Sequence, residues 1–483
     1  MAYQWEMVEL AFTGTTEPWV VFTSDTEEKR VRGFWDGGSS YRVRFLPMRS
    51  GRYAWRREGT DERGRFEALP ARSHGPVGVR DPYWFQYADG SPYQEIGTTC
   101  YVWELQDDRT ISQTLESLER SPFNKVRFCL LPKHYHYNYQ DPRMFPFPGT
   151  PVDARSLNQE TYGQYGPESE GNHWDFSRVD PAYWRHVDHC VERLGELGIQ
   201  ADLILFHPYD RWGFSRMGRE YDDAYTRYVV SRYAAYPHVW WSLANEWDLC
   251  RYKDVEDWNR LGRLVRDEDP YGHLRSIHNW HTPFDPHADW ITHASVQRWS
   301  QYDHAQKTRE LRASYQKPVV MDEVGYEGNL MQFWGSLPAS EMVNQFWLAT
   351  VRGGYCGHSE TFEGERIWWS HGGVLKGESY KRLFFLKQFL EHVPGGELEP
   401  ARISPWGDNS ARAAKFPDSF LVLYADFHTL GSFHYRFPGQ EQWRVTQKDV
   451  WEMTSKDLGV HSGWFHIRLE GKPWQLFVLE RLA

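Results

Sequence analysis

The chain has 483 residues, of which 55 are basic and 66 acidic, giving a formal net charge of −11 at pH 7. This length suggests two or three domains, and the negative charge argues against nucleic acid or an anionic membrane as a partner. The 25 Trp, 28 Tyr and 27 Phe are individually expected in the core, but as an excess they favour a carbohydrate partner, because aromatic rings stack on the apolar faces of sugars.

The N-terminal segment MAYQWEMVEL has no basic region followed by an apolar region, so no signal peptide is predicted. No later run approaches the roughly 18 apolar residues of a membrane span, and no membrane partner is expected. The five cysteines lack a CxxC pair, which fits reduced and mostly buried thiols. We therefore expect a cytoplasmic protein that meets small imported sugars.

Residues 1–88 consist of short apolar runs between turn signals. The runs 18–23 (PWVVFT) and 40–45 (SYRVRF) have the composition of strands, and Gly37-Gly38 supplies a turn. This segment is predicted to be an N-terminal β-sandwich. The segment 83–92 is a plausible bridge to the next domain.

Residues 89–394 alternate strand and helix patterns, which predicts a parallel sheet in an α/β domain. Helical patterns cover 181–198, 255–269 and 341–352, and Asp269-Pro270 is expected to end the second helix. Eight strand candidates between such helices predict a closed (β/α)8 (TIM) barrel: 93–103, 123–132, 199–208, 239–247, 274–280, 290–298, 317–326 and 353–362. The insert 134–178, after strand 2, is expected to form a wall of the active site.

Residues 395–483 return to short β-runs, including 420–424, 431–436 and 474–479. They predict a C-terminal β-sandwich domain. Accessory β-domains often build subunit interfaces, so a homo-oligomer stays open.

Two carboxylates follow apolar runs at the ends of predicted barrel strands. The run 239–244 (VWWSLA) leads into Asn245-Glu246, at the end of strand 4, and 318–321 (PVVM) leads into Asp322-Glu323, at the end of strand 7. The carboxyl ends of barrel strands form the catalytic face, so Glu246 and Glu323 are expected to face one pocket. Two carboxylates facing each other across a pocket are the equipment of glycosidic bond cleavage.

The neighbours of each glutamate suggest different roles. Asn245 is expected to hydrogen-bond a sugar hydroxyl beside Glu246, the predicted acid/base. Trp240, Trp241 and Trp247 could supply an apolar setting that raises the pKa of Glu246. Glu323 is the predicted nucleophile, held ionised by hydrogen bonds or a nearby arginine such as Arg127. Asp248 and Asp322 are expected to support or cap rather than to react.

With these motifs the chain resembles a clan A glycoside hydrolase, the superfamily of barrels with an Asn-Glu acid/base after strand 4 and a Glu nucleophile after strand 7. The layout is also similar to a subgroup with an N-terminal sandwich of unknown-function type, an apiosidase-like or cellulase-like barrel and a C-terminal β-domain. The resemblance implies a retaining, exo-acting glycosidase for small oligosaccharides or glycosides. It implies no metal and no cofactor.

The resemblance also implies substrate-binding positions. Arg127, in the strand 2 segment, would support the nucleophile, although a structural ion pair is equally expected there. His207 and His278 match sugar-contacting residues, while a strand-end histidine is often only a hydrogen-bonded packing residue. The candidates for the position usually filled by an aromatic residue after strand 6 are Gln297, Trp299 and Tyr302. The candidates for the aromatic platform under the sugar, after strand 8, are Trp368 and Trp369.

Two alternative functions stay open. His134-Tyr135-His136 has the HxH form of metal-dependent barrel hydrolases of the amidohydrolase type, but it follows strand 2 instead of lying on strand 1. A non-catalytic sugar-binding protein would also explain the aromatic excess. The pair of strand-end glutamates disfavours this last interpretation.

Overall fold

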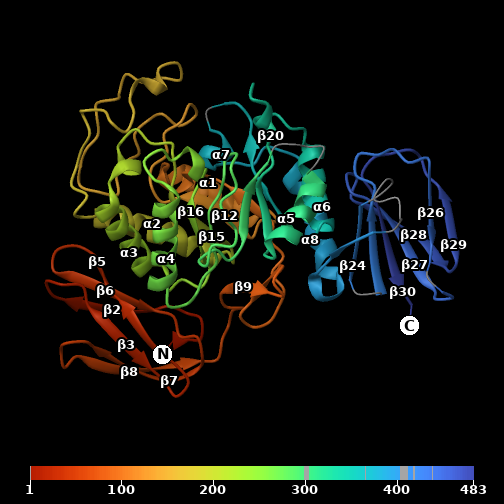
Figure 1. Ribbon diagram of the computed structural model, residues 1–483. Coiled ribbons are helices and arrows are strands. Elements are labelled where there is room, and N and C mark those ends of the chain that lie inside the picture. Colours follow the sequence, from red (N-terminus) through yellow and green to blue (C-terminus); the bar gives the residue numbers. More distant parts are fainter. Residues whose placement is uncertain are drawn as a thin grey trace.

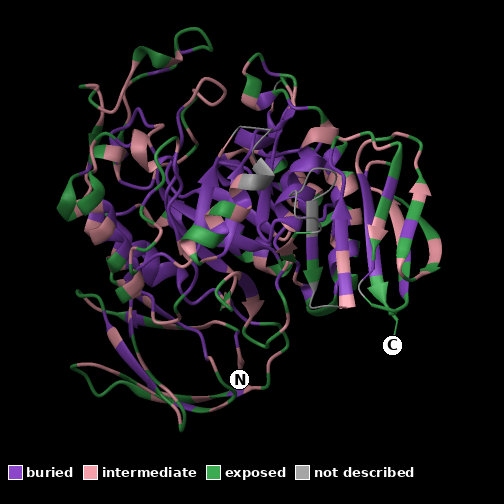
Figure 2. Ribbon diagram, turned by 45° about the vertical axis from the view of Figure 1, so that its right-hand side comes forward, coloured by how far each residue is buried: buried purple, intermediate pink, exposed green. Residues whose placement is uncertain are grey.

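The computed structural model of the chain describes residues 2–298, 304–364, 366–402, 412–416, 419–437 and 439–482. A central barrel carries one β-rich domain near each end of the chain (Figure 1). The N-terminal domain packs below the barrel, and the C-terminal domain stands beside it (Figure 1). Buried residues concentrate in the barrel strands, and exposed residues gather on the loops and on the two outer domains (Figure 2). The predicted α/β barrel with flanking β-domains is confirmed.

The N-terminal domain is a sandwich of two sheets, ordered β1-β8-β7-β3-β4 and β2-β6-β5. Its core is aromatic, with Phe22 stacked on Phe45 at 4.0 Å between ring centroids and Tyr53 stacked on Phe66 at 5.1 Å. Alternate residues of β2, β7 and β8 face this core, as the two-residue period of a strand requires. The strands are β1 (Ala2–Tyr3), β2 (Val8–Thr13), β3 (Trp19–Thr23), β4 (Glu28–Arg32), β5 (Phe34–Trp35), β6 (Ser40–Phe45), β7 (Gly51–Arg57) and β8 (Arg63–Leu69).

A hairpin of β9 (Val77–Arg80) and β10 (Trp84–Tyr87) links the sandwich to the barrel. Phe85 of this hairpin packs against Trp240 and Tyr355, and its backbone N–H donates to the Tyr355 hydroxyl at 3.0 Å. These rings close the barrel at the end opposite the predicted catalytic face.

Eight parallel strands form the barrel, in the order β17-β16-β15-β12-β11-β21-β19-β18. A bridge between His278 and Ser295 joins the two ends of this order. Each strand lies inside one of the eight predicted ranges, so Glu246 follows the fourth strand and Glu323 ends the seventh. The strands are β11 (Gly97–Thr99), β12 (Lys125–Cys129), β15 (Gln200–Phe206), β16 (Val239–Ala244), β17 (Arg275–Ser276), β18 (Ala294–Gln297), β19 (Val319–Glu323) and β21 (Tyr355–His358).

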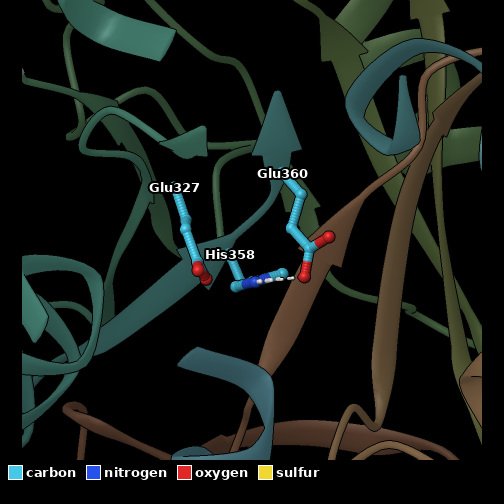
Figure 3. Close-up of side chains that lie close together, drawn as sticks. All are labelled: Glu327, His358 and Glu360. Atoms are coloured by element: carbon cyan, nitrogen blue, oxygen red, sulfur yellow. Dashed lines mark ion pairs between the residues drawn. The ribbon is translucent and has the colours of Figure 1, made fainter. Parts of the chain in front are cut away.

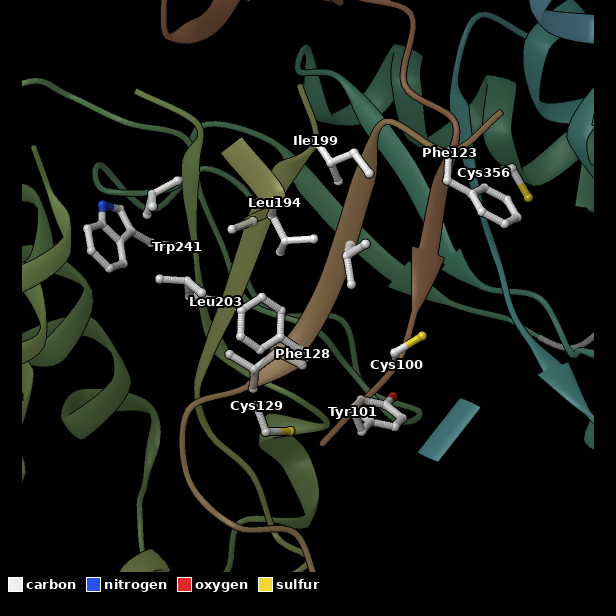
Figure 4. Close-up of a cluster of buried hydrophobic side chains, with 14 of the residues drawn as sticks. Cys100, Tyr101, Phe123, Phe128, Cys129, Leu194, Ile199, Leu203, Trp241 and Cys356 are labelled. Carbon is white, nitrogen blue, oxygen red and sulfur yellow. The ribbon is translucent and has the colours of Figure 1, made fainter. Parts of the chain in front are cut away.

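Helices surround the barrel and bury its outward-facing residues. Phe128, Leu203 and Trp241 point away from the barrel axis into a buried apolar layer that includes Leu194 of α2 (Figure 4). The helices are α1 (Asp108–Glu119), α2 (Pro181–Glu196), α3 (Arg219–Tyr233), α4 (Val255–Glu268), α5 (His304–Tyr315), α6 (Ala339–Val351), α7 (Trp368–His371) and α8 (Ser379–His392). Within the described part of the chain, none of the helices is both long enough and apolar enough to cross a membrane.

The predicted helix boundaries have clear local causes. Asp180 caps α2 by accepting a hydrogen bond from the Ala182 N–H, and Pro181 occupies its first turn. Asp254 and Asp257 form a capping box at the start of α4, which ends at Asp269 as predicted.

Short elements complete the connections between the barrel strands and helices. The insert 134–178 carries a two-stranded ribbon and one 3-10 turn, and a second two-stranded ribbon follows strands 7 and 8. These elements are β13 (Gly149–Thr150), β14 (His173–Trp174), β20 (Glu327–Gly328), β22 (Glu360–Thr361), η1 (Trp103–Leu105), η2 (Tyr162–Gln164), η3 (Phe214–Arg216), η4 (Trp247–Leu249), η5 (Phe333–Gly335) and η6 (Pro394–Gly396).

The C-terminal domain contains a six-stranded sheet, β23-β24-β25-β30-β27-β28, and the pair β26-β29. Tyr424 anchors it to the barrel, because its hydroxyl donates to Asn344 of α6 at 2.7 Å and its ring packs on Trp347. The strands are β23 (Glu399–Ala401), β24 (Arg412–Phe416), β25 (Phe420–Tyr424), β26 (Ser432–Arg436), β27 (Trp443–Asp449), β28 (Thr454–His461), β29 (Trp464–Arg468) and β30 (Gln475–Arg481).

Candidate active site

Glu246 lies directly after β16 in a backbone conformation that is rare for glutamate. Its φ of 47° and ψ of 57° fall in the left-handed region, where a non-glycine side chain is strained. The backbone on either side is held by hydrogen bonds, from the Asn245 N–H to Phe206 O at 2.9 Å and from the Trp247 N–H to His278 O at 2.9 Å. This turn buries the carboxyl group, and the Tyr209 hydroxyl donates to its Oε2 atom.

Glu323 is the last residue of β19, and it is buried among hydrogen-bond donors. Arg127 Nη1 lies 3.3 Å from its Oε1 atom, and the Tyr101 hydroxyl donates to the same oxygen. The Nε2 atom of His278 lies 3.8 Å from that oxygen. Three elements of the barrel therefore position this carboxylate.

Asn245 connects the surroundings of the two glutamates. Its Oδ1 atom accepts a hydrogen bond from Arg127 Nη2 at 2.9 Å and lies 3.1 Å from the Tyr101 hydroxyl. The oxygen of the amide therefore already accepts from the Arg127 guanidinium. Its –NH₂ group remains the part of the side chain that can donate to a sugar hydroxyl.

The pKa values of the two glutamates are shifted in opposite directions. Burial, and then the charge of Glu323, raises the pKa of Glu246 to about 7, against the hydrogen bond from Tyr209. Burial also acts on Glu323, but His278, the Arg127 guanidinium and the Tyr101 hydroxyl outweigh it and hold the pKa of Glu323 below its ordinary value. One carboxyl can thus carry a proton at neutral pH while its neighbour stays ionised.

The Apiosidase-like catalytic domain family matches residues 81–394 of the chain. The chain belongs to the apiosidase-like family. Two families of domains of unknown function, DUF5060 and DUF5605, match residues 1–59 and 406–478 of this apiosidase-like protein. No curated protein matches it.

Solved structures agree with this assignment. A candidate glycoside hydrolase from Bacteroides vulgatus is 34% identical, with a TM-score of 0.90, and the match covers 100% of this chain and 99% of that one. A family 5 glycoside hydrolase from the same organism is 15% identical, with a TM-score of 0.62, and the match covers 84% of this chain and 94% of that one. At this lower identity the second match supports the fold of the apiosidase-like barrel alone.

The other predicted substrate-binding residues of the apiosidase-like barrel fall into three groups. Gln297 ends β18 beyond a bulge that sets it opposite Glu323. Its side chain lies near the Glu246 carboxyl and lowers the pKa of that group, although its amide makes no hydrogen bond of normal geometry. His207 donates from Nε2 to Leu131 O at 3.1 Å, which is a packing arrangement, although its Nδ1 atom is buried without a partner. Trp299 and Tyr302 lie outside the described residues.

The two candidates for the sugar platform after strand 8 separate clearly. Trp369 faces the site, with its ring 5.3 Å from that of Tyr101 and 5.1 Å from that of Trp334. Trp368 points elsewhere, since its Nε1–H donates to Thr98 at 3.0 Å inside the protein. Of the two candidates for the sugar platform, Trp369 is therefore the one that remains.

The prediction that tryptophans of strand 4 surround Glu246 is wrong. Trp240 donates to Gln200 and packs on Phe85 at the closed end of the barrel. Trp241 points outward and donates to Asp269 at 3.0 Å. Trp247 is directed away by a hydrogen bond to Thr282 O. The side chains of successive strand residues alternate in direction, and residues 240 and 241 come too early in the strand to reach its carboxyl end.

Three residues of the site were not predicted from the sequence: Tyr101, Lys133 and Tyr209. Each comes at or shortly after the carboxyl end of a predicted strand, in YVW, LLPK and HPY, so strand-end position was the available signal. The predicted supporting acids do have such roles. Asp248 accepts from the N–H groups of Trp280, His281 and Thr282, and Asp322 accepts from Lys125.

The histidines of the HxH motif do not converge on a metal site. His134 Nε2 donates to Tyr162 O at 2.7 Å, and His136 Nε2 lies 2.9 Å from Gln159. In the described residues, the side chains that lie close enough to hold a metal ion are Glu327, His358 and Glu360 (Figure 3).

The hydrogen bonds around this trio are those of a structural cluster. Trp368 Nε1–H donates to Thr98 Oγ1, which leaves the Thr98 proton for His358 Nδ1 at 3.2 Å. His358 then carries its own proton on Nε2, which faces Ser379 at 3.2 Å, and Ser379 donates to Glu327. The Ser379 hydroxyl thus joins His358 to Glu327 inside the protein, and these contacts account for the cluster as a structural one.

Proposed function

We propose that the protein is a retaining glycosidase that acts on small glycosides or oligosaccharides. The observation that carries the proposal is the pair of buried strand-end glutamates with different partners, Tyr209 at Glu246 and Arg127 at Glu323. Burial raises the pKa of Glu246 to about 7, whereas the pKa of Glu323 is lowered. Membership of the apiosidase-like family and the 34% identity to a candidate glycoside hydrolase support it.

In the proposed first step, Glu323 attacks the anomeric carbon while Glu246 gives its proton to the oxygen of the leaving group. This forms a covalent glycosyl-enzyme and releases the aglycone. Arg127 and Tyr101 orient the attacking carboxylate, and the Asn245 amide donates to a hydroxyl of the sugar.

In the proposed second step, Glu246 takes a proton from water, which attacks the anomeric carbon and frees Glu323. The two inversions give net retention of configuration. The burial of both carboxyl groups strengthens these interactions by excluding bulk water.

We also propose exo action. The insert 134–178 supports exo action. Together with residues near 366–371 the insert lines a cavity of about 570 Å³ beside the site, so the catalytic face of the barrel is bounded on one side and is not an open groove there. A cytoplasmic location is proposed as well, supported by five cysteines that are all free and buried.

The test uses a panel of 4-nitrophenyl glycosides that includes a β-apioside, neutral β-hexosides and β-hexuronides. Glu323→Gln should lower kcat/KM, and Glu246→Gln should lower kcat, by about 10³-fold or more on any of these substrates that the wild-type enzyme cleaves. With azide, Glu246→Ala should form a glycosyl azide of retained configuration, and Glu323→Ala one of inverted configuration. Undiminished turnover by either Gln variant would contradict the assignment.

The same panel separates the two alternatives. Binding of sugars with no turnover of any glycoside would favour a non-catalytic carbohydrate-binding protein. Loss of activity on chelation, restored by zinc, would favour a metal-dependent hydrolase.

A further inference from the structure

Lys133 is a buried lysine at the catalytic end of the barrel, four residues after β12, and its side chain is 3% exposed. Across the described part of the chain, its Nζ atom has no carboxylate within ion-pair distance and no hydrogen-bond acceptor. Two other lysines with buried side chains in the described part of the chain are paired. Lys125 Nζ lies 2.9 Å from Glu95, and Lys253 Nζ lies 3.0 Å from Asp222.

Aromatic rings surround the Lys133 ammonium instead. Nζ lies 3.2 Å from the ring centroid of Tyr101, 4.4 Å from that of Tyr209 and 4.8 Å from that of Trp369. Tyr101 is the hydrogen-bond donor to Glu323, and Tyr209 is the donor to Glu246. The ammonium therefore lies between the supports of the two proposed reacting groups.

This environment leaves the ammonium without hydrogen bonds. Ring faces attract a cation, but they accept no directed hydrogen bond from its three N–H groups. Burial lowers the pKa of Lys133 to about 8, and the charges of Glu246 and Glu323 oppose this shift. A buried cation of this kind is costly unless an anion pairs with it.

The neighbouring cavity of about 570 Å³ has Lys133 in its lining. The two arginines that line this cavity already form ion pairs, Arg143 with Asp108 at 2.9 Å and Arg366 with Asp107 at 2.6 Å. Among the described residues that line this cavity, Lys133 is thus the lysine or arginine without a carboxylate partner.

We propose that Lys133 binds a carboxylate carried by the sugar, so that the substrates are acidic glycosides of the hexuronide type. This inference rests on the proposed function. A sugar hydroxyl could accept a hydrogen bond from the ammonium, but only an anionic group also neutralises its buried charge. The rings of Tyr101 and Trp369 would bound the same sugar.

The experiment compares glycosides that differ only at the acidic group: 4-nitrophenyl β-glucuronide with β-glucoside, and β-galacturonide with β-galactoside. In at least one pair the acidic member should have a kcat/KM at least about tenfold higher. Lys133→Met should lower kcat/KM on the acidic member by about 10- to 100-fold more than on the neutral member, the effect of losing one charge-assisted hydrogen bond. Lys133→Arg, which keeps the charge, should retain more of the preference.

A matched control is Lys381→Met, since Lys381 lies on the surface of α8. Thermal unfolding checks that each variant folds, and Lys133→Gln replaces the Met variant where that one does not. Equal or better turnover of both neutral members, or an equal loss on both members of a pair in Lys133→Met, would overturn the inference while the proposed glycosidase function stands.

A binding measurement keeps the inference testable if the enzyme cleaves no glycoside, a result that would contradict the proposed function. Titration calorimetry with free D-glucuronate and D-galacturonate, against D-glucose and D-galactose, should then show tighter binding of an acidic sugar that depends on Lys133. No preference for either acidic sugar would overturn the inference.

Discussion

Arg127 donates to Asn245 across the barrel, with 2.9 Å between Nη2 and Oδ1, and its other terminal nitrogen lies 3.3 Å from Glu323. One guanidinium therefore fixes the residue before the proposed acid and the proposed nucleophile itself. Its planar fork allows both contacts at once, which a lysine ammonium cannot reproduce with the same geometry.

Replacing Arg127 with Met should lower kcat/KM by about 10²- to 10³-fold, because it removes both contacts. The guanidinium lowers the pKa of Glu323, so its removal should also move the acid limb of the pH profile to higher pH. Arg127→Lys should recover part of the activity, since the charge remains. A pH profile of Arg127→Met with an unmoved acid limb would contradict the role of Arg127.

The wild-type pH profile of kcat/KM should be bell-shaped. Activity should fall as the pH rises through about 7, because Glu246 must carry a proton to donate it. On the acid side, activity should persist below the ordinary range of a glutamate, because the pKa of Glu323 is lowered. Initial rates from pH 3 to 9 on one glycoside with a poor leaving group, such as an alkyl glycoside, measure both limbs.

Tyr209→Phe tests the assignment of the basic limb. The hydrogen bond from Tyr209 favours the ionised form of Glu246. Without it the pKa of Glu246 should rise, and the basic limb should move to higher pH. Tyr162→Phe is the control, because Tyr162 lies in the insert and its hydroxyl makes no hydrogen bond to Glu246. A shift toward lower pH in Tyr209→Phe would contradict this account.

Strand-end position is the part of the site that could be predicted from sequence. The apolar runs before Glu246 and Glu323 identified their strands, and parallel strands place their carboxyl ends together. The roles of Trp240 and Trp241 were misjudged, because nearness along the chain does not give the direction of a side chain in a strand. Tyr101, Lys133 and Tyr209 meet only because three separate strands close into a barrel, and no local pattern encodes that contact.

The two tryptophans of α7 should behave differently. Trp369→Ala should lower kcat/KM by about tenfold or more, because its ring faces the site. The ring is also buried, so the free energy of unfolding should fall as well. Trp368→Phe should lower the free energy of unfolding by about 1 kcal/mol, through loss of the hydrogen bond to Thr98, with less than about threefold change in kcat/KM. Urea denaturation and initial rates measure these effects, and a reversed pattern would show that Trp368 is the platform.

Lys125 should contribute strongly to the stability of the folded protein. It lies 3.0 Å from Asp322 and 3.6 Å from Asp202 in the barrel interior. Lys125→Met should lower the free energy of unfolding at pH 7 by about 3–5 kcal/mol, because it leaves buried carboxylates without a cation. Lys381→Met, a surface change, should have little effect.

The pH dependence of this loss has a definite sign. In the wild-type protein the pKa of Asp322 is lowered, so its contribution to stability is present at neutral pH and is lost as the pH falls. In Lys125→Met the orphaned carboxyls should have raised pKa values, so stability should recover as the pH falls from 7 to 5. A variant that loses further stability over this range would contradict the pairing.

In the proposed reaction Glu323 attacks the sugar while Glu246 supplies the proton. The most direct measurement incubates the enzyme with a 2-deoxy-2-fluoro glycoside of a sugar that it cleaves and locates the label by peptide mass spectrometry. We predict one covalent sugar per chain, attached to Glu323. A label on any other residue, or an unlabelled enzyme that releases a product of inverted configuration, would contradict the account.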